Sequence, residues 1–284
     1  MANDTNILAI DVGSSCIKLG WFPAAGACAS DKPASLPIAA TPLATPAEVF
    51  RVDHRDRLAE QWTAAVDACL SELPASEEIE CIVASVHRGV AEKLLTRLQL
   101  RAWRRLASLR AADLALTVRV AEPEKVGIDR LLGVLAINQL RRPESPAVAI
   151  DIGTATTVDL VGSDGAFEGG AIVAGPTLTL SALHAGTASL PQLDAKVLAS
   201  PPPVVGKSTI EAMASGAYWG AVGAIRELVK QLARQCATPP QVFLTGGGAD
   251  GFAPQIGLED QPARHLPHLV LSGIRLAAER SAAV

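Results

Sequence analysis

A short acidic motif occurs twice in this chain, and the repeat constrains the fold more than any other feature. Residues 9–14 (AIDVGS) align with residues 149–154 (AIDIGT), and an alternating apolar stretch follows each copy. Each copy predicts a strand, a tight turn and a second strand. Repetition of a whole supersecondary unit is typical of a duplicated architecture. The sequence therefore predicts two related α/β halves, each beginning with a β-hairpin.

The turn of each hairpin combines a carboxylate, a glycine and small hydroxyl residues. Glycine permits close approach of the backbone to a ligand. Successive backbone N–H groups and hydroxyls suit phosphate oxygens, and the carboxylate suits a cation that neutralises them. Both turns are therefore candidate phosphate loops.

Composition limits the class of protein. The chain has 284 residues, of which 49% are hydrophobic and 19% charged, so it can form one large or two ordinary domains. A net charge of −4 gives no sign of nucleic-acid binding. The five cysteines are scattered, which favours reduced thiols in a cytoplasmic protein, and no signal peptide or membrane span is expected.

The remaining elements follow from periodicity. Further strands are expected at 80–86, 114–120, a stretch ending at 169–176, and 241–245, and residues 23–50 are expected to be mostly loop. Helices are expected at 53–73, 88–100, 131–140, 176–183, 208–234 and 266–279. The helix at 208–234 is rich in small residues, so we expect it to pack closely against another backbone or a ligand.

Several motifs have alternative interpretations. Asp129 and Arg130 lie in the first turn of a helix, where the dipole favours a carboxylate, and they are equally explained as a plain charge pair. The arginines between Arg97 and Arg110 are better explained as a solvated face than as a binding patch. Gly206-Lys207-Ser208 imitates a P-loop, but it lacks the required glycine and strand before it. The five histidines show no ligand spacing.

Taken in order, these pieces resemble the type III pantothenate kinases, in the superfamily of actin, sugar kinases and heat-shock-protein ATPases. The resemblance covers nearly the whole chain, and its most specific parts are residues 127–130 (GIDR), 151–157 (DIGTATT), 169–175 (GGAIVAG) and 187–191 (TASLP). It implies an α/β fold of two ribonuclease-H-like domains, 1–120 and 121–284, with a nucleotide cleft between them. In this division the last helix can pack back on the first domain.

The resemblance also implies an activity: ATP-dependent phosphorylation of pantothenate, the first step of coenzyme A synthesis. It implies Mg²⁺, a monovalent cation (K⁺ or NH₄⁺) and a homodimer. Asp129 matches the catalytic carboxylate that acts as general base. Asp11 would act on Mg²⁺ directly or through water, and Asp151 would hold the monovalent cation.

The ligand contacts are implied in the same way. The ATP-binding positions would be Asp11, Val12, Gly13, Ser14, Ser15, Cys16, Ile17, Lys18, Thr154, Gly246 and Gly247. The pantothenate-binding positions would be Val120, Gly127, Ile128, Asp129, Arg130 and Thr187. A pairing of Arg130 with the substrate carboxylate is our own inference from charge.

The chain departs from the family pattern at three places. The first turn reads Gly13-Ser14-Ser15 where the family usually has Gly-Asn-Thr, and Val120 stands where it often has a tyrosine. Ala174 replaces a usual proline. Two alternatives therefore stay open: a non-catalytic nucleotide-binding regulator on the same fold, and a kinase for another small hydroxyl substrate. Retention of Asp11, Asp129 and Asp151 favours the enzyme.

Overall fold

The structure is a computed structural model that describes residues 5–24, 43–55, 57–258 and 261–281. Contacts divide the chain into two compact units. The first comprises Met1–Leu116, Glu122–Leu140 and His268–Val284, and the second comprises Thr117–Ala121 and Arg141–Pro267. The grouping by contacts thus differs from the predicted division at residue 120, because the helix at 128–140 belongs to the first unit.

Each unit contains one five-stranded sheet. In the first unit the strand order is β3-β2-β1-β4-β5, with bounds β1 Asn6–Val12, β2 Cys16–Phe22, β3 Glu48–Asp53, β4 Ile79–Ser85 and β5 Arg105–Ser108. In the second it is β12-β9-β6-β7-β8, with bounds β6 Ala147–Ile152, β7 Ala155–Val161, β8 Phe167–Ala174, β9 Gln241–Thr245 and β12 Arg264–His265. A small hairpin of β10 Gly257–Leu258 and β11 Gln261–Pro262 completes the strands of the described residues.

The two sheets share one topology. In both, the first three strands in sequence are antiparallel neighbours, and the fourth and fifth are added in parallel beside the first. Thus β1 corresponds to β6, β4 to β9 and β5 to β12. The duplication predicted from the repeated hexapeptide is confirmed at the level of strand order.

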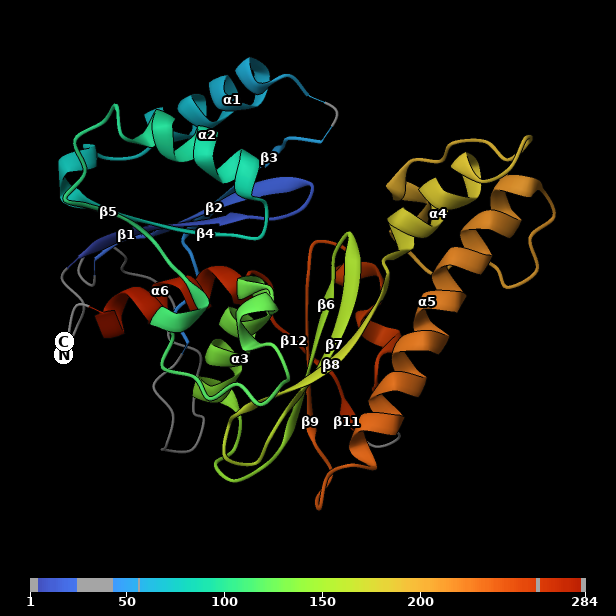
Figure 1. Cartoon of the computed structure of the whole chain (residues 1–284). Coiled ribbons are helices and arrows are strands. Elements are labelled where there is room, and N and C mark those ends of the chain that lie inside the picture. Colours follow the sequence, from blue (N-terminus) through green and yellow to red (C-terminus); the bar gives the residue numbers. More distant parts are fainter. Residues whose placement is uncertain (1–4, 25–42, 56, 259–260, 282–284) are drawn as a thin grey trace. The chain divides into compact units, whose positions relative to one another are not determined.

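Six α-helices accompany the sheets in the described residues: α1 Ala59–Ser71, α2 Arg88–Leu98, α3 Ile128–Leu140, α4 Pro176–Ala185, α5 Thr209–Ala233 and α6 Leu269–Ser281. In the first unit α1 and α2 cover one face of the sheet, and α3 and α6 cover the other (Figure 1). In the second unit α5 packs along the sheet and α4 packs on α5 (Figure 1).

The core of the first unit explains its helices. Trp62, Val66 and Leu70 of α1 are buried against the sheet at four-residue spacing. Leu58 is 68% exposed because it precedes the helix as its N-cap. The predicted helix at 53–73 therefore begins later, at Ala59, because β3 continues to Asp53.

On the opposite face, α6 packs closely because two glycines leave room for it. A Cβ on Gly20 of β2 would lie 2.9 Å from Cδ1 of Leu271. A Cβ on Gly273 of α6 would lie 2.2 Å from the carbonyl oxygen of Leu132 in α3. The last helix therefore packs on the first unit, together with α3.

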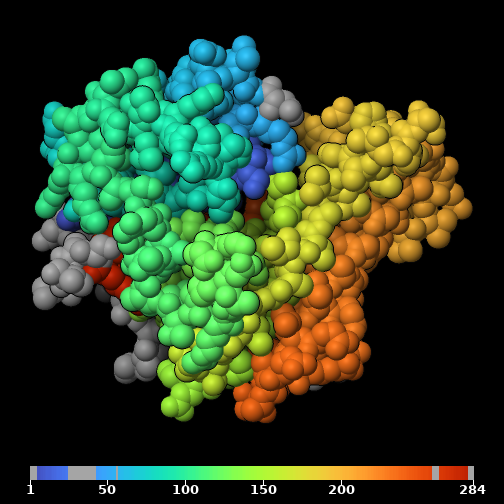
Figure 2. Space-filling view, in the orientation of Figure 1, coloured from blue at the N-terminus to red at the C-terminus, as the bar shows by residue number. Residues whose placement is uncertain are grey.

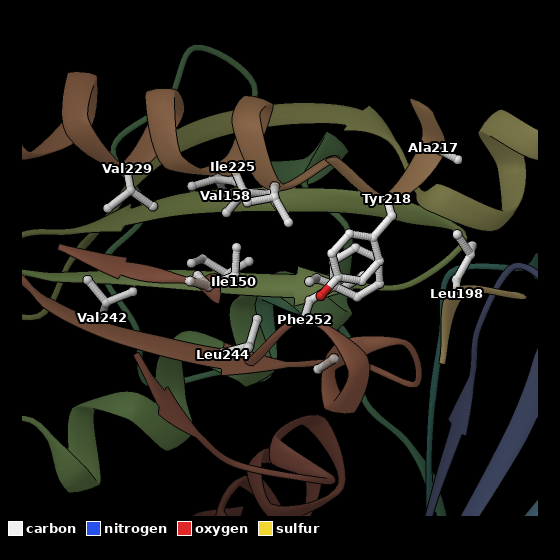
Figure 3. Close-up of a cluster of buried hydrophobic side chains, with 14 of the residues drawn as sticks. Ile150, Val158, Leu198, Ala217, Tyr218, Ile225, Val229, Val242, Leu244 and Phe252 are labelled. Carbon is white, nitrogen blue, oxygen red and sulfur yellow. The ribbon is translucent and has the colours of Figure 1, made fainter. Parts of the chain in front are cut away.

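The core of the second unit is formed around the second hairpin (Figure 3). Ile150 and Val158 from the hairpin meet Ile225 and Val229 of α5 in one buried cluster with β9. Tyr218 of α5 is also buried there: its ring stacks on Phe252 with centroids 4.4 Å apart, and its hydroxyl donates to the carbonyl of Gly251 at 2.6 Å. Burial of Ile150 and Val158 in this cluster fixes the register of the hairpin.

One predicted strand is wrong. Residues 114–120 form no strand in the part of the chain that the structure describes, apart from an isolated bridge between Val118 and Phe167. The fifth strand of the first sheet is Arg105–Ser108, inside the arginine-rich stretch. This strand is only partly buried, and its sequence lacks the continuous apolar run that is typical of a buried parallel strand. Among the arginines before it, Arg97 binds Asp67, which agrees with a solvated face.

None of the helices among the described residues is both long enough and apolar enough to cross a membrane.

Candidate active site

The first turn connects β1 to β2 through three residues, Gly13–Ser15. The N–H of Gly13 donates to the carbonyl of Cys16 at 3.0 Å and closes the turn, and Ser14 is exposed at its tip. The side chains of Val12 and Cys16 are buried, as is that of Ile17. Of the predicted phosphate contacts, these three could therefore act only through their backbones.

Asp11 and Lys18 are direct partners across β1 and β2. Paired residues project to the same face of a sheet, so the carboxylate and the ammonium group lie on one side of the hairpin. Asp11 is only 7% exposed. This half of the predicted site thus has both signs of charge beside the turn.

Asp129 lies at the start of α3, close to the first turn. A Cβ added to Gly127 would lie 2.5 Å from Asp129 Oδ1 and 3.6 Å from Cγ1 of Val86. The N–H of Val86, just after β4, donates to the carbonyl of Val12 at 3.1 Å. The predicted base, the end of β4 and the end of β1 are therefore neighbours within the first unit.

Burial raises the pKa of the Asp129 carboxyl above its ordinary value. The N–H of Arg130, which donates to Asp129 Oδ1 at 2.8 Å, opposes this rise, as do the charges of Arg130 and Lys18. A carboxylate with a raised pKa accepts a proton more readily than an ordinary one.

The second turn is held by glycines. Gly175 donates its N–H to the carbonyl of Thr154 at 3.0 Å, and a Cβ there would lie 2.2 Å from the carbonyl oxygen of Gly153. Gly246, whose φ is +109°, lies close to the end of β6, and a Cβ on it would be 2.5 Å from Asp151 Oδ1. The predicted ATP residues Thr154 and Gly246 are thus brought together around Asp151.

The cross-strand partner of Asp151 is Thr157. The equivalent carboxylate in the first hairpin faces a lysine, whereas this one faces a neutral hydroxyl. Such a neighbourhood of oxygen atoms suits a hard cation. Gly247, the last predicted ATP residue, is exposed in the turn after β9.

The predicted pantothenate residues fall into two groups. Gly127 and Arg130 lie with Asp129 in the first unit, whereas Val120 and Thr187 lie in the second. Ile128 has a buried side chain, so it could contact a substrate only through its backbone.

In the second group, Val120 packs beside Gly169, whose φ is +97°: its Cγ1 would lie 3.4 Å from a Cβ on that glycine. Thr187 is exposed just after α4. Its hydroxyl donates to the carbonyl of Leu183 at 2.8 Å.

Asp11 and Asp151 could each contribute one carboxylate ligand to the predicted metal ions. No group of three or more His, Cys, Asp or Glu side chains with metal-binding geometry occurs among the described residues. Mg²⁺ in nucleotide sites is usually held by one or two carboxylates together with phosphate oxygens and water. Asp11, buried beside the phosphate turn, meets that requirement.

Sequence reasoning missed the residues that support the first turn. His54 and Arg55 follow β3, and their backbone N–H groups both donate to the carbonyl of Ser15, at 3.0 and 3.3 Å. The His54 Nε2 is 2.9 Å from the carbonyl oxygen of Gly13, and Arg55 Nη2 bonds Ser15 Oγ. No sequence signal pointed to these two residues, because a helix was predicted from residue 53 onward.

Comparison with known proteins identifies the family. The family model described as type III pantothenate kinase matches residues 7–231. A type III pantothenate kinase from Rhodospirillum rubrum is 43% identical over 50% of this chain and 53% of its own length. One from Paramagnetospirillum magneticum is 35% identical over 72% of this chain and 84% of its own length. The matched part thus spans about half of the first relative and most of the second.

Among solved structures, a Baf family protein from Campylobacter jejuni is similar with a TM-score of 0.57 and 16% identity, covering 98% of this chain and 100% of that one. At this identity the likeness shows the fold alone. The family match spans both acidic hairpins, the Asp129 motif and the turn at Gly175. The chain therefore belongs to the type III pantothenate kinase family.

Proposed function

We propose that this protein transfers the γ-phosphoryl group of ATP to the primary hydroxyl of pantothenate, with Asp129 as general base. The observation that carries the proposal is the position of Asp129. It lies beside Gly127, which neighbours Val86, and the N–H of Val86 donates to Val12, the residue before the first turn. Burial raises the pKa of the Asp129 carboxyl. A carboxylate so placed is suited to deprotonate an alcohol next to a bound triphosphate.

The chemistry balances with these groups alone. Asp129 takes the hydroxyl proton as the pantothenate oxygen forms a bond to the γ-phosphorus, and the bond to the β,γ-bridging oxygen breaks to release ADP. Phosphoryl transfer depends mainly on positioning and on neutralising charge. In this chain Lys18 supplies a fixed positive charge, and Mg²⁺ held by Asp11 would supply another.

The phosphates of ATP would be bound by Asp11–Lys18 and Thr154, with Gly246 and Gly247 near the nucleoside. The two hairpin turns support this role because small residues and backbone groups are what remain accessible there. Asp151 would hold K⁺ or NH₄⁺. Its cross-strand partner, the neutral Thr157, supports a cation at this place.

Pantothenate would contact Gly127, Asp129, Arg130 and Thr187. The guanidinium of Arg130 would pair with the pantothenate carboxylate. Val120 offers no hydroxyl, so it would contribute only an apolar contact. Such an enzyme would work in the cytoplasm, where its thiols stay reduced.

A homodimer is supported by the surface of the second unit. A Cβ on Gly216, Gly220 or Gly223 of α5 would meet no heavy atom of the described residues within 4 Å, its own helix backbone aside. Val204, Val205 and Ile210, before and at the start of that helix, are 71%, 67% and 49% exposed. Figure 2 shows α5, in orange, on the outer surface of this unit.

Light scattering tests the dimer directly. The wild-type chain should have twice the mass of 29.4 kDa, and Gly220→Leu should reduce it to the single value by blocking close helix approach. A wild-type monomer at assay concentration would contradict this part of the proposal.

The activity is tested by ADP release with pantothenate, Mg²⁺ and K⁺, with mass spectrometry of the product. Pantothenate-dependent ADP release and a product heavier by one phosphoryl group are expected. Replacing K⁺ by Na⁺ should reduce turnover, since the Asp151 site would be poorly filled. No pantothenate-dependent release from protein that binds ATP would refute the assignment.

That same negative result would favour the regulator, the second candidate. The Campylobacter jejuni protein of similar fold is provisionally described as a transcriptional activator. Phosphorylation of another small alcohol, but not of pantothenate, would instead favour a kinase with a different substrate.

A further inference from the structure

The imidazole of His54 is buried directly against the phosphate turn of the first hairpin. It is only 8% exposed, and its Nε2 lies 2.9 Å from the carbonyl oxygen of Gly13. A carbonyl only accepts hydrogen bonds, so Nε2 carries the proton and donates. The backbone N–H of the same residue donates to the carbonyl of Ser15 at 3.0 Å. One residue therefore holds both ends of the three-residue turn.

This contact has a consequence on the other side of the turn. A peptide group is planar and trans, so its N–H points away from its carbonyl. Fixing the Gly13 carbonyl toward His54 therefore aims the N–H of Ser14 in the opposite direction. Ser14 is the exposed residue at the tip, and its N–H is one of the groups expected to donate to a phosphate.

His54 is itself held in place by a second histidine. The rings of His54 and His87 meet edge to face, with centroids 5.4 Å apart. His87 caps α2, because its Nδ1 accepts the N–H of Val90 at 3.3 Å. The support for the turn therefore extends to the end of β4, where Val86 also bonds the carbonyl of Val12.

We propose that His54 is a positioning residue for nucleotide binding, which orients the Ser14 N–H toward an ATP phosphate through its bond to the Gly13 carbonyl. The proposal rests on the function proposed above and deepens it. A histidine that merely filled space would be replaceable by an apolar side chain of similar size. A positioning histidine requires an N–H donor at that place.

Two variants separate these roles. His54→Leu fills the space without a donor, and His54→Gln keeps an N–H donor of similar reach. The Kd for a non-hydrolysable ATP analogue, AMPPNP with Mg²⁺, should rise about tenfold in His54→Leu, as expected for a lost buried hydrogen bond. It should stay within about threefold of wild type in His54→Gln, where the bond is restored.

Steady-state kinetics give a second readout. In His54→Leu the KM for ATP should rise with the Kd, while the KM for pantothenate and kcat change less than about twofold, because only nucleotide binding is affected. Val66→Ala serves as the control: it destabilises the core of the same unit without touching the turn. Its Kd for AMPPNP should equal that of wild type. Should His54→Leu not fold, His54→Met takes its place.

Equal weakening of AMPPNP binding in the leucine and glutamine variants would overturn the proposal, as would unchanged binding in both. A similar loss in Val66→Ala would overturn it too, since a general loss of stability would explain the effect. Wild-type protein that fails to bind AMPPNP would also refute it. Wild-type protein that binds AMPPNP without phosphorylating pantothenate would refute the proposed function alone.

Discussion

The two acidic hairpins have the same topology, but their turns are stabilised by different means. The first turn is held by side chains and backbone of the segment after β3, through His54 and Arg55. The second is held by close backbone approach at Gly175 and Gly246. The two hairpins thus share their strand pairing but not the contacts that fix each turn.

The carboxylates also differ in their surroundings. Asp11 faces Lys18 across the hairpin, and Asp151 faces Thr157. The first hairpin therefore has a positive charge opposite its carboxylate, whereas the cross-strand partner of the second carboxylate is neutral. The proposed Mg²⁺ site at Asp11 and the proposed monovalent cation site at Asp151 therefore have different cross-strand neighbours. The first prediction below tests the contrast between the two turns.

The largest effect on stability is expected from adding a methyl group at Gly246, which packs against the second hairpin. In Gly246→Ala the Cβ would lie 2.4 Å from the carbonyl oxygen of Ile152, at a φ of +109°. The strain should reduce the free energy of unfolding by about 2–4 kcal/mol. Gly13→Ala, whose Cβ would be 3.3 Å from the Cys16 carbonyl, should lose less than about 1 kcal/mol. Chemical denaturation measures both, and equal losses would contradict the contrast.

A smaller change should displace the base without unfolding the protein. In Gly127→Ala the new methyl would meet Asp129 Oδ1 at 2.5 Å, and the carboxylate would have to move. Misplacement of a catalytic group by about 1 Å should lower kcat by about 10- to 100-fold. Gly133→Ala, in the same helix with open space at its Cβ, should leave kcat unchanged. A normal kcat in Gly127→Ala would place the base elsewhere.

The pH dependence follows from the raised pKa of Asp129. The base acts when ionised, so kcat/KM should fall as the pH drops through the pKa of the free enzyme. That pKa is raised, so the decline should begin at a higher pH than the ordinary aspartate value of 3.8 would allow. A pH–rate profile of wild type, taken where the fold is intact, checks this. Activity constant down to the ordinary aspartate range would contradict it.

The smallest effect concerns α5. Gly216→Ala replaces an exposed helical glycine with open space at its Cβ, so the monomeric fold should gain about 0.5–1 kcal/mol from helix propensity. Loss of stability would mean that another backbone packs closely on this glycine. Chemical denaturation at low protein concentration measures whether the free energy of unfolding rises or falls.

The fold was largely predictable because its duplication is visible in the sequence. The hexapeptides at 9–14 and 149–154 predicted both hairpins, and apolar spacing predicted α1, α2 and α5. The strand at Arg105–Ser108 was not predictable, since arginines interrupt its apolar pattern. The place of α3 in the first unit was also missed, because it depends on packing at Gly273 and not on chain order.

The candidate site residues were named where family motifs cover them, and their roles stay predictions. Asp129 and Gly127 were singled out by the resemblance at residues 127–130, because the residues alone are equally explained as a charge pair at a helix start. His54 did not stand out, since a lone histidine after a strand is more often an ordinary core residue. Its role depends on a hydrogen bond between residues 41 positions apart in sequence.

The central claim is that Asp129 is the base of a pantothenate kinase, and Asp129→Asn tests it most directly when turnover and nucleotide binding are measured on the same preparation. The amide cannot take the hydroxyl proton, so kcat should fall by about 100-fold or more. The Kd for AMPPNP with Mg²⁺ should stay near that of wild type. Wild-type kcat in Asp129→Asn would contradict the account.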